Sequence, residues 1–271
     1  MSSRQSERIR DRLSDWFATR RRKMELATNE VHVWRGRLTS SFQTRQELRD
    51  LLSPDEFEHA SRFNFDLHRE QYTIGRGLLR IILSMYTDVP PDRIAFEYTQ
   101  YGKPFLRDAL VQFNVSHSHG LALYALAKEK RLGVDVEWMR PMRDQEAIAR
   151  QFFSQAEYKD WLSLDPSIRN VGFFNCWTRK EAYLKAVGSG LYTPLDSFEV
   201  SLKPDTAAVL NSIDGRSLPA SQWSLFHLNP GQDFVGALAI YGNQWDLRHV
   251  CWSEASSLVH SLDADLGILL S

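Results

Sequence analysis

Alternating and helical patterns of apolar residues divide the chain into strands and helices. Short apolar or alternating runs predict strands at residues 31–34, 94–98, 112–115, 121–127, 132–137, 198–202, 223–228 and 234–240. Apolar residues at helical spacing predict long amphipathic helices over 67–86 and 168–187. This order of elements predicts a mixed α/β (α+β) fold.

Two shorter helices have clear starting signals. Ser53, Pro54 and Glu56 form a capping box with proline at the first helical position. Ser154 and Glu157 form a second capping box. Each of these helices is expected to precede one of the two long ones.

The two halves of the chain also resemble each other weakly. SPDEF at Ser53 echoes SQAEY at Ser154, and YTIGRGLLR echoes WTRKEAYLK. AFEY and VHVW have counterparts about a hundred residues later in SFEV and VDVE. We therefore expect two similar subdomains, at 31–131 and 132–250. Ligand sites favour the interface between such units.

Composition and charge limit the classes of protein. The chain has 271 residues, 43% hydrophobic and 25% charged, which is typical of a soluble globular protein. A formal net charge of −1 argues against a protein whose whole surface binds nucleic acid. No apolar run approaches the ~18 residues of a membrane span. Two cysteines fit neither a disulfide framework nor zinc spacing, so we expect a cytoplasmic protein.

The two ends differ from the middle. The first thirty residues hold eight Lys or Arg and five acids, with little apolar periodicity. This pattern predicts a basic, disordered extension at 1–30, with a start at Met24 as the alternative. Residues 251–271 are expected to form a C-terminal tail.

Two carboxylates lie within the strand predicted over 132–137. Side chains of a strand alternate between faces, so Asp135 and Glu137 share one face and the valines beside them share the other. A solvated acidic face would give this pattern. The alternative is a site for a hard cation, which binds oxygen ligands gathered on one face.

The second long helix carries a carboxylate on its apolar face. At 100° per residue, Glu181 falls beside Trp177. Lys185 lies one turn further along, and Lys180 lies on the other flank. A surface ion pair between Glu181 and Lys185 is one explanation, although it stabilises by only ~0.3 to 0.5 kcal/mol. A carboxylate facing an apolar interior otherwise needs a partner or a metal.

A third polar group lies in FNVSHSHG, residues 113–120, where the strand predicted over 112–115 runs into two histidines that alternate with serines. Ser116, His117 and Ser118 supply donors that suit a phosphate, whereas a strand end solvated by water is the alternative. A nucleophilic triad of Ser116, His117 and Asp135 is disfavoured because adjacent residues of a strand point to opposite faces.

Together these residues suggest metal-assisted transfer at a pyrophosphate. Asp135, Glu137 and Glu181 offer three carboxylates to Mg²⁺, which prefers oxygen ligands shared with substrate phosphates. Three basic groups would neutralise phosphate oxygens or protonate a leaving group, namely Lys180, Lys185 and His117.

The motifs FNVSHS, GVDVE and WTRKEAYLKAVGSGL, in this order, resemble the signature motifs of the phosphopantetheinyl transferases. YGKPF at Tyr101 resembles the upstream motif of the Sfp-type branch, and the resemblance covers 31–240. It implies two α/β subdomains related by a pseudo-twofold axis, with coenzyme A bound at their interface. It also implies transfer of the 4'-phosphopantetheine arm to a serine of an apo acyl or peptidyl carrier protein, releasing adenosine 3',5'-bisphosphate.

The resemblance further implies roles for individual residues. Asp135, Glu137 and Glu181 would hold Mg²⁺, with Mn²⁺ as an alternative, and Glu181 would act as base for the carrier serine. Lys180 and Lys185 would stabilise the leaving phosphate. Coenzyme A would be contacted by Ser116, His117, Lys103, Pro104, Arg69 and Arg62.

The chain departs from the family pattern near the nucleotide. Some members carry lysines that reach the ribose-side phosphate, where this chain has Glu56 and His59. Arg62 or Arg69 would then have to bind that phosphate. The basic N-terminal extension is also outside the pattern.

Two other functions stay open at this point. One is an Mg²⁺-dependent nuclease or nucleotidyl transferase, which the near-neutral charge and the lack of a basic stripe disfavour. The other is a non-catalytic module that binds coenzyme A. For the transferase we expect a monomer, since one chain holds both halves of the site. Its partners would be coenzyme A and carrier proteins, with no nucleic acid and no membrane.

Overall fold

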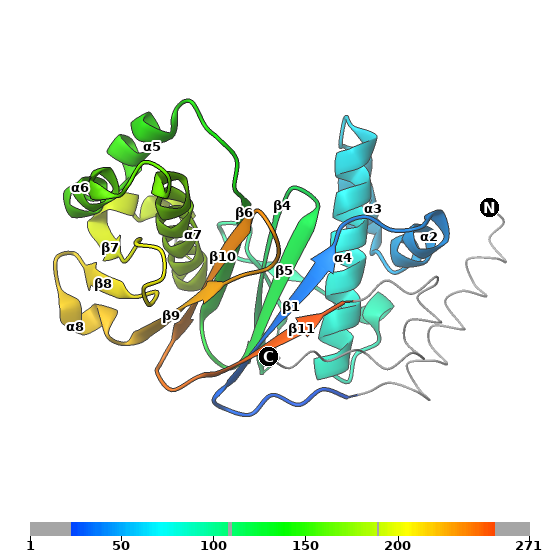
Figure 1. The fold of residues 1–271 in the computed structure, drawn as a ribbon. Helices are drawn as coiled ribbons and strands as arrows, with labels where there is room; N and C mark the ends of the chain where they lie inside the picture. The colour runs from blue at the N-terminus through cyan, green and yellow to red at the C-terminus, as the bar shows by residue number, and fades with distance from the viewer. Residues whose placement is uncertain (1–22, 108–109, 189, 253–271) are drawn as a thin grey trace, which may run out of the picture.

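The computed structural model describes residues 23–107, 110–188 and 190–252, and they form the expected mixed α+β fold (Figure 1). The helices are α2 (Phe42–Asp50), α3 (Pro54–Ser61), α4 (Asp66–Tyr86), α5 (Gln145–Phe152), α6 (Gln155–Ser163), α7 (Arg169–Val187) and α8 (Ser217–Ala220). The strands are β1 (Glu30–Arg37), β2 (Glu97–Tyr98), β3 (Pro104–Phe105), β4 (Val111–Ser118), β5 (Leu121–Lys128), β6 (Leu132–Trp138), β7 (Phe198–Val200), β8 (Leu210–Ile213), β9 (Trp223–Leu228), β10 (Phe234–Tyr241) and β11 (Asp246–Cys251).

Two sheets lie between the two long helices (Figure 1). One sheet has the order β11-β1-β5-β4 and the other has the order β6-β10-β9. Helix α4 packs on the first sheet through Leu78 and Tyr124, and α7 packs on the second through Leu184 and Ala237. A third apolar cluster lies between the sheets and includes Val33, Leu123, Val134, Val136 and Leu238.

The repeat seen in the sequence has a structural counterpart. Helices α3 and α6 both begin with capping boxes, from Ser53 and Glu56 and from Ser154 and Glu157, as predicted. Each is followed by one of the long helices, α4 or α7. Strand β11 then returns to the first sheet and pairs in parallel with β1. The division at residue 131 stays a prediction.

Several elements differ from the expected pattern. The sequence did not indicate α2, α5, α8, β3, β8 or β11. The strand expected over 94–98 shrinks to β2, because Pro91–Arg93 forms a 3-10 turn whose last bond joins the Ile94 N–H to the Pro91 carbonyl. The strand expected over 198–202 ends at Val200.

The described N-terminal residues belong to the folded unit. The backbone N–H of Met24 donates to the Met85 carbonyl at 2.8 Å, and Leu26 packs against the first core cluster. The residues from 23 onward therefore contact the folded unit, and the expected extension at 1–30 stays a prediction. Residues 1–22 and most of the expected tail, 253–271, lie outside the described residues.

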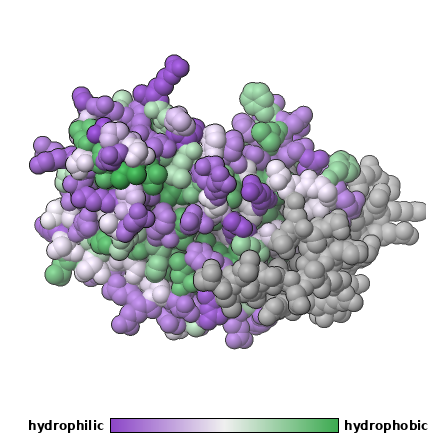
Figure 2. Space-filling view, in the orientation of Figure 1, coloured by the Kyte–Doolittle hydropathy of each residue, from purple (hydrophilic) through white to green (hydrophobic). Residues whose placement is uncertain are grey.

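The surface is mixed in polarity. Figure 2 shows hydrophilic side chains over most of the visible face, with apolar groups between them. Within the described ranges, each helix is too short or too polar to cross a membrane.

Candidate active site

A close approach of α7 to β6 builds the candidate site. A Cβ added to Gly133 would lie 2.2 Å from the carbonyl oxygen of Ala182, so only glycine fits between the helix and the strand. Gly133 shares a strand face with Asp135. The helix residues Glu181 and Lys185 are thereby held close to the strand carboxylates.

Asp135 is the most buried of the three carboxylates, at 4% exposure. Its Oδ1 accepts a hydrogen bond from Ser116 Oγ at 2.9 Å and from Lys185 Nζ at 2.6 Å. Its Oδ2 is also buried and has no hydrogen-bond partner among the described residues. The alternative of a solvated acidic face is therefore wrong, and a buried oxygen is left for a further ligand.

The other two carboxylates are also perturbed by this environment. Burial, and then the nearby charge of Asp135, raise the pKa of Glu137 and of Glu181. Lys185 partly opposes both shifts. Among the described residues, the carboxylates of Asp135, Glu137 and Glu181 are not close enough together to form a group of three metal ligands.

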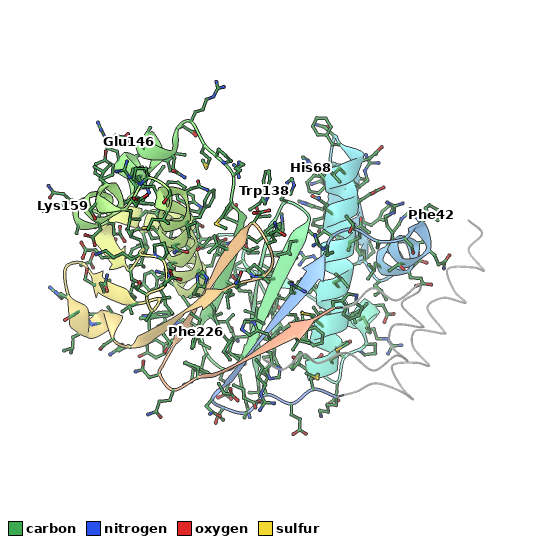
Figure 3. All side chains as sticks on the ribbon, in the orientation of Figure 1. Phe42, His68, Trp138, Glu146, Lys159 and Phe226 are labelled. Atoms are coloured by element: carbon green, nitrogen blue, oxygen red, sulfur yellow. The ribbon has the colours of Figure 1, made fainter. Side chains whose placement is uncertain are left out.

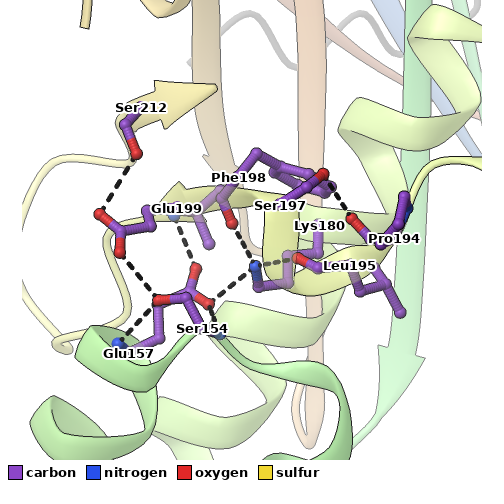
Figure 4. Close-up of polar contacts among 10 residues, drawn as sticks. Ser154, Glu157, Lys180, Pro194, Leu195, Ser197, Phe198, Glu199 and Ser212 are labelled. Carbon is purple, nitrogen blue, oxygen red and sulfur yellow. Dashed lines mark hydrogen bonds and ion pairs between the residues drawn. The ribbon is translucent and has the colours of Figure 1, made fainter. Parts of the chain in front are cut away.

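Lys180 does not lie at this site, which corrects the sequence-based prediction (Figure 4). Its side chain is fully buried, and Nζ donates to the carbonyls of Leu195 and Phe198, both at 2.6 Å. The ammonium also pairs with Glu157 Oε2 at 2.7 Å. Lys180 therefore ties α7 to α6 and to the chain before β7. Helical periodicity placed it on a flank but could not show which neighbour that flank meets.

Lys185 pairs with a carboxylate of β6. Its ammonium reaches across to Asp135 on β6, so the alternative of a simple surface pair with Glu181 is not what the structure shows. The side chain is 30% exposed, which leaves the charge accessible to a ligand.

A cavity of about 360 Å³ opens beside these residues. The loop before β3, the start of β3, the strand β4 and the end of α7 contribute to its lining, which includes Tyr101, Lys103, Pro104, Asn114, Glu181 and Lys185. Lys103 Nζ donates to the Leu132 carbonyl at 3.0 Å and to the Lys185 carbonyl at 2.6 Å. Burial lowers the pKa of Lys103 to about 8. The structure thus places Lys103 and Pro104 in the lining of the same cavity as Glu181 and Lys185.

Ser116 and His117, the two residues of β4 that were predicted to contact phosphate, have different surroundings. Ser116 gives its single O–H to Asp135, and its oxygen accepts from Lys185 Nζ and from the Val136 N–H. A hydroxyl has one donor and two acceptor sites, so Ser116 has no donor left for a phosphate. His117 lies at the surface, where partial desolvation and the charge of Lys185 lower its pKa.

Neither arginine expected at coenzyme A lines this cavity. Arg62 is 69% exposed and pairs with Glu58. Arg69 pairs with Asp66 and lines a separate hollow between α2, α3 and α4. Glu56, at the position where family members carry a lysine, is buried and pairs with Arg80 at 2.7 Å.

Three further residues at or next to β6 were not predicted from the sequence: Gly133, Trp138 and His119. Gly133 was detectable as a glycine inside a strand, which often marks a close backbone approach. Trp138 lies at the end of β6, as labelled in Figure 3. Its ring stacks on His119 with ring centroids 4.0 Å apart. His119 has a left-handed φ of 46° in the turn between β4 and β5. Only the folded structure brings these rings together.

Comparisons with known proteins identify the family of the chain. The model of the 4'-phosphopantetheinyl transferase superfamily matches residues 131–239, and the model of the 4'-phosphopantetheinyl transferase N-terminal region matches 39–130. The 4'-phosphopantetheinyl transferase HetI of Nostoc sp. is 40% identical over 226 residues, covering 82% of this chain and 92% of the relative. The 4'-phosphopantetheinyl transferase Sfp of Bacillus subtilis is 31% identical over 178 residues, covering 65% and 78%. The chain therefore belongs to the Sfp-type 4'-phosphopantetheinyl transferases.

Proposed function

We propose that the protein transfers the 4'-phosphopantetheine arm of coenzyme A to a serine of an apo acyl or peptidyl carrier protein. The observation that carries this proposal is the junction of Lys185 with Asp135 beside a cavity bounded by Lys103 and Glu181. The serine oxygen would attack the phosphorus that bears the pantetheine arm. The bond from that phosphorus to the bridging oxygen would break, and adenosine 3',5'-bisphosphate would leave.

The oxygen ligands of Asp135, Glu137 and Glu181 are of the type that suits a magnesium ion, with Mn²⁺ as an alternative, although the three side chains do not converge on one point in this structure. Asp135 Oδ2 is buried without a partner in the described chain, and the pKa values of Glu137 and Glu181 are raised by burial and by the charge of Asp135. A cation would relieve this repulsion, and carboxylate oxygens are the ligands that Mg²⁺ prefers. When bound, the ion would neutralise charge on the pyrophosphate oxygens.

Glu181 is the proposed acceptor of the serine proton. Burial and the nearby charge of Asp135 raise its pKa, which makes it a stronger base than an ordinary glutamate. Lys185 would stabilise the charge that develops on the leaving phosphate, since its ammonium is partly exposed at the cavity. Both side chains come from one face of α7, which fixes their relative position.

Lys103 and Pro104 are proposed to flank the adenine. They form one wall of the cavity, and Tyr101 from the same loop contacts Tyr192, with ring centroids 5.1 Å apart. Flat apolar and aromatic surfaces suit a purine base. His117 is proposed to contact a phosphate, because it lies near the charge of Lys185 at the end of β4.

We also propose that the protein works as a cytoplasmic monomer, without nucleic acid or a membrane. Residues from both halves of one chain line the cavity, so a second copy is not needed to complete it. Cys176 and Cys251 are both free thiols, as suits a reducing compartment. Membership in the transferase family does not favour the nuclease alternative.

Mass spectrometry of a carrier protein tests the proposed reaction. Purified protein is mixed with coenzyme A, Mg²⁺ and an apo acyl carrier protein, with and without a chelator. We expect a mass gain of one phosphopantetheine that the chelator abolishes. No gain with several carriers, despite measurable binding of coenzyme A, would mean that the chain is a binding module.

A further inference from the structure

Strands β4 and β6 are neighbours that belong to different sheets. Backbone N–H groups of β6 donate hydrogen bonds to polar side chains of β4, which take the place of backbone carbonyls. The pairs are Asn114 Oδ1 with Val134 N at 2.8 Å, Ser116 Oγ with Val136 N at 3.4 Å, and Ser118 Oγ with Trp138 N at 3.1 Å. Each pair is 20 residues apart, so the strands run parallel and in step.

The serines of this row make a second contact that the asparagine does not. Ser118 Oγ donates to Glu137 Oε2 at 3.0 Å, and Ser116 Oγ donates to Asp135 Oδ1 at 2.9 Å. A serine hydroxyl can normally rotate. Here the N–H of the next β6 residue fixes the acceptor side, so the O–H is directed at the carboxylate. Each serine thus connects the junction between the sheets to one candidate metal ligand.

We propose that Ser118 is a positioning residue that orients Glu137 for the cation. The hydroxyl holds one carboxylate oxygen and leaves the other to meet the ion. Groups that hydrogen-bond to metal ligands orient them and tune their affinity for the metal. Ser118 is more informative than Ser116, because Ser116 also contacts Lys185. This inference rests on the magnesium site of the proposed function.

Binding of Mn²⁺, followed by electron paramagnetic resonance with the full chain and saturating coenzyme A, tests this proposal. Ser118→Ala should weaken Mn²⁺ binding about 10- to 100-fold. Ser118→Thr should bind Mn²⁺ as the wild type does. Ser118→Val, whose side chain has the same shape as threonine but no hydroxyl, should behave like the alanine variant. This pair keeps the shape of the side chain and changes only the hydroxyl, so it separates orientation from folding.

Ser201→Ala is the matched control. Ser201 Oγ also accepts a backbone N–H, from Val209 at 2.9 Å, and makes its other contacts with Ala207 and Arg179. Its loss should leave Mn²⁺ binding unchanged.

The possible results lead to different conclusions. Wild-type Mn²⁺ affinity in Ser118→Val would overturn the positioning role while leaving the metal site intact. Weaker binding of coenzyme A to Ser118→Ala in the absence of metal would instead assign Ser118 to a phosphate, and would also overturn it. A wild-type protein that binds no Mn²⁺ would refute the magnesium site and this inference together.

Discussion

Lys185 Nζ lies 2.6 Å from Asp135 Oδ1, so a cation of α7 meets a buried carboxylate of β6. The two residues are 50 positions apart in the chain and come together only because the helix packs directly on the strand. Lys185 also lines the cavity, together with Glu181 one helical turn before it. This is the arrangement that transfer at a pyrophosphate requires, since the phosphate oxygens and a cation must be held together.

Lys185→Ala should reduce the rate of transfer at saturating coenzyme A. Removal of one group that stabilises developing charge typically costs about 10²- to 10³-fold in kcat. Lys159→Ala, an exposed lysine on α6, is the control and should keep the wild-type rate. Single-turnover measurements of phosphopantetheine transfer check this prediction, and an unchanged rate in Lys185→Ala would exclude the lysine from catalysis.

Lys180→Met should act on stability. It leaves the buried carboxylate of Glu157 without its cation, and the loss of one partner of a buried pair costs ~3 to 5 kcal/mol. The double variant Glu157→Gln with Lys180→Met should lose less, because no charge stays unpaired. Urea unfolding measures both. If Lys180→Met kept its stability but lost transfer activity, Lys180 would be catalytic after all.

Gly133→Ala should push α7 away from β6. The added Cβ would meet backbone atoms of Ala182, which cannot move independently of the helix. We expect a loss of at least ~2 kcal/mol in the free energy of unfolding. Gly75→Ala in α4 is the control, since its Cβ would meet only side chains, at 3.3 Å or more. Equal costs in the two variants would show that the close approach is not tight.

The affinity for coenzyme A should fall at alkaline pH through Lys103. Burial lowers its pKa to about 8, so the ammonium loses its charge as the pH rises through that value. The KM for the anionic substrate should then increase, whereas Lys103→Arg keeps its charge and should give a flatter profile. The same alkaline rise in both proteins would assign the effect to another group.

Alkaline pH should have the opposite effect on the stability that Lys103 contributes to the fold. The ordinary pKa of lysine is 10.5, so between about 8 and 10.5 the unfolded chain binds more protons at Lys103 than the folded protein does. The contribution of Lys103 to the free energy of unfolding should therefore rise with pH in this window. Urea unfolding at several pH values, compared with Lys103→Arg, measures this contribution.

Local patterns predicted the parts of the fold that depend on local chemistry. The capping boxes at Ser53 and Ser154 were correct because they need only residues three apart. The shared orientation of Asp135 and Glu137 follows from strand alternation alone. By contrast, β11 was missed because its pairing with β1 joins segments from opposite ends of the chain. Strand pairing over such distances leaves little trace in the sequence.

The candidate site shows the same limit. Motif residues on β6 and α7 were found, but Lys180 was misassigned because its partners, Leu195, Phe198 and Glu157, lie on other elements. Periodicity shows which face of a helix a residue occupies. It does not show what packs against that face. The double contacts of Ser116 and Ser118 were likewise hidden, since they depend on how β4 lies beside β6.

Glu181 is proposed to accept the proton of the carrier serine during transfer within this acidic site. The most direct measurement is the single-turnover transfer rate of Glu181→Gln at saturating coenzyme A and Mg²⁺, with Glu25→Gln, an exposed carboxylate before β1, as control. We predict that Glu181→Gln stays folded and loses at least ~10²-fold in rate, because the amide can neither accept the serine proton nor offer a charged ligand. A rate within a few-fold of the control would contradict the account.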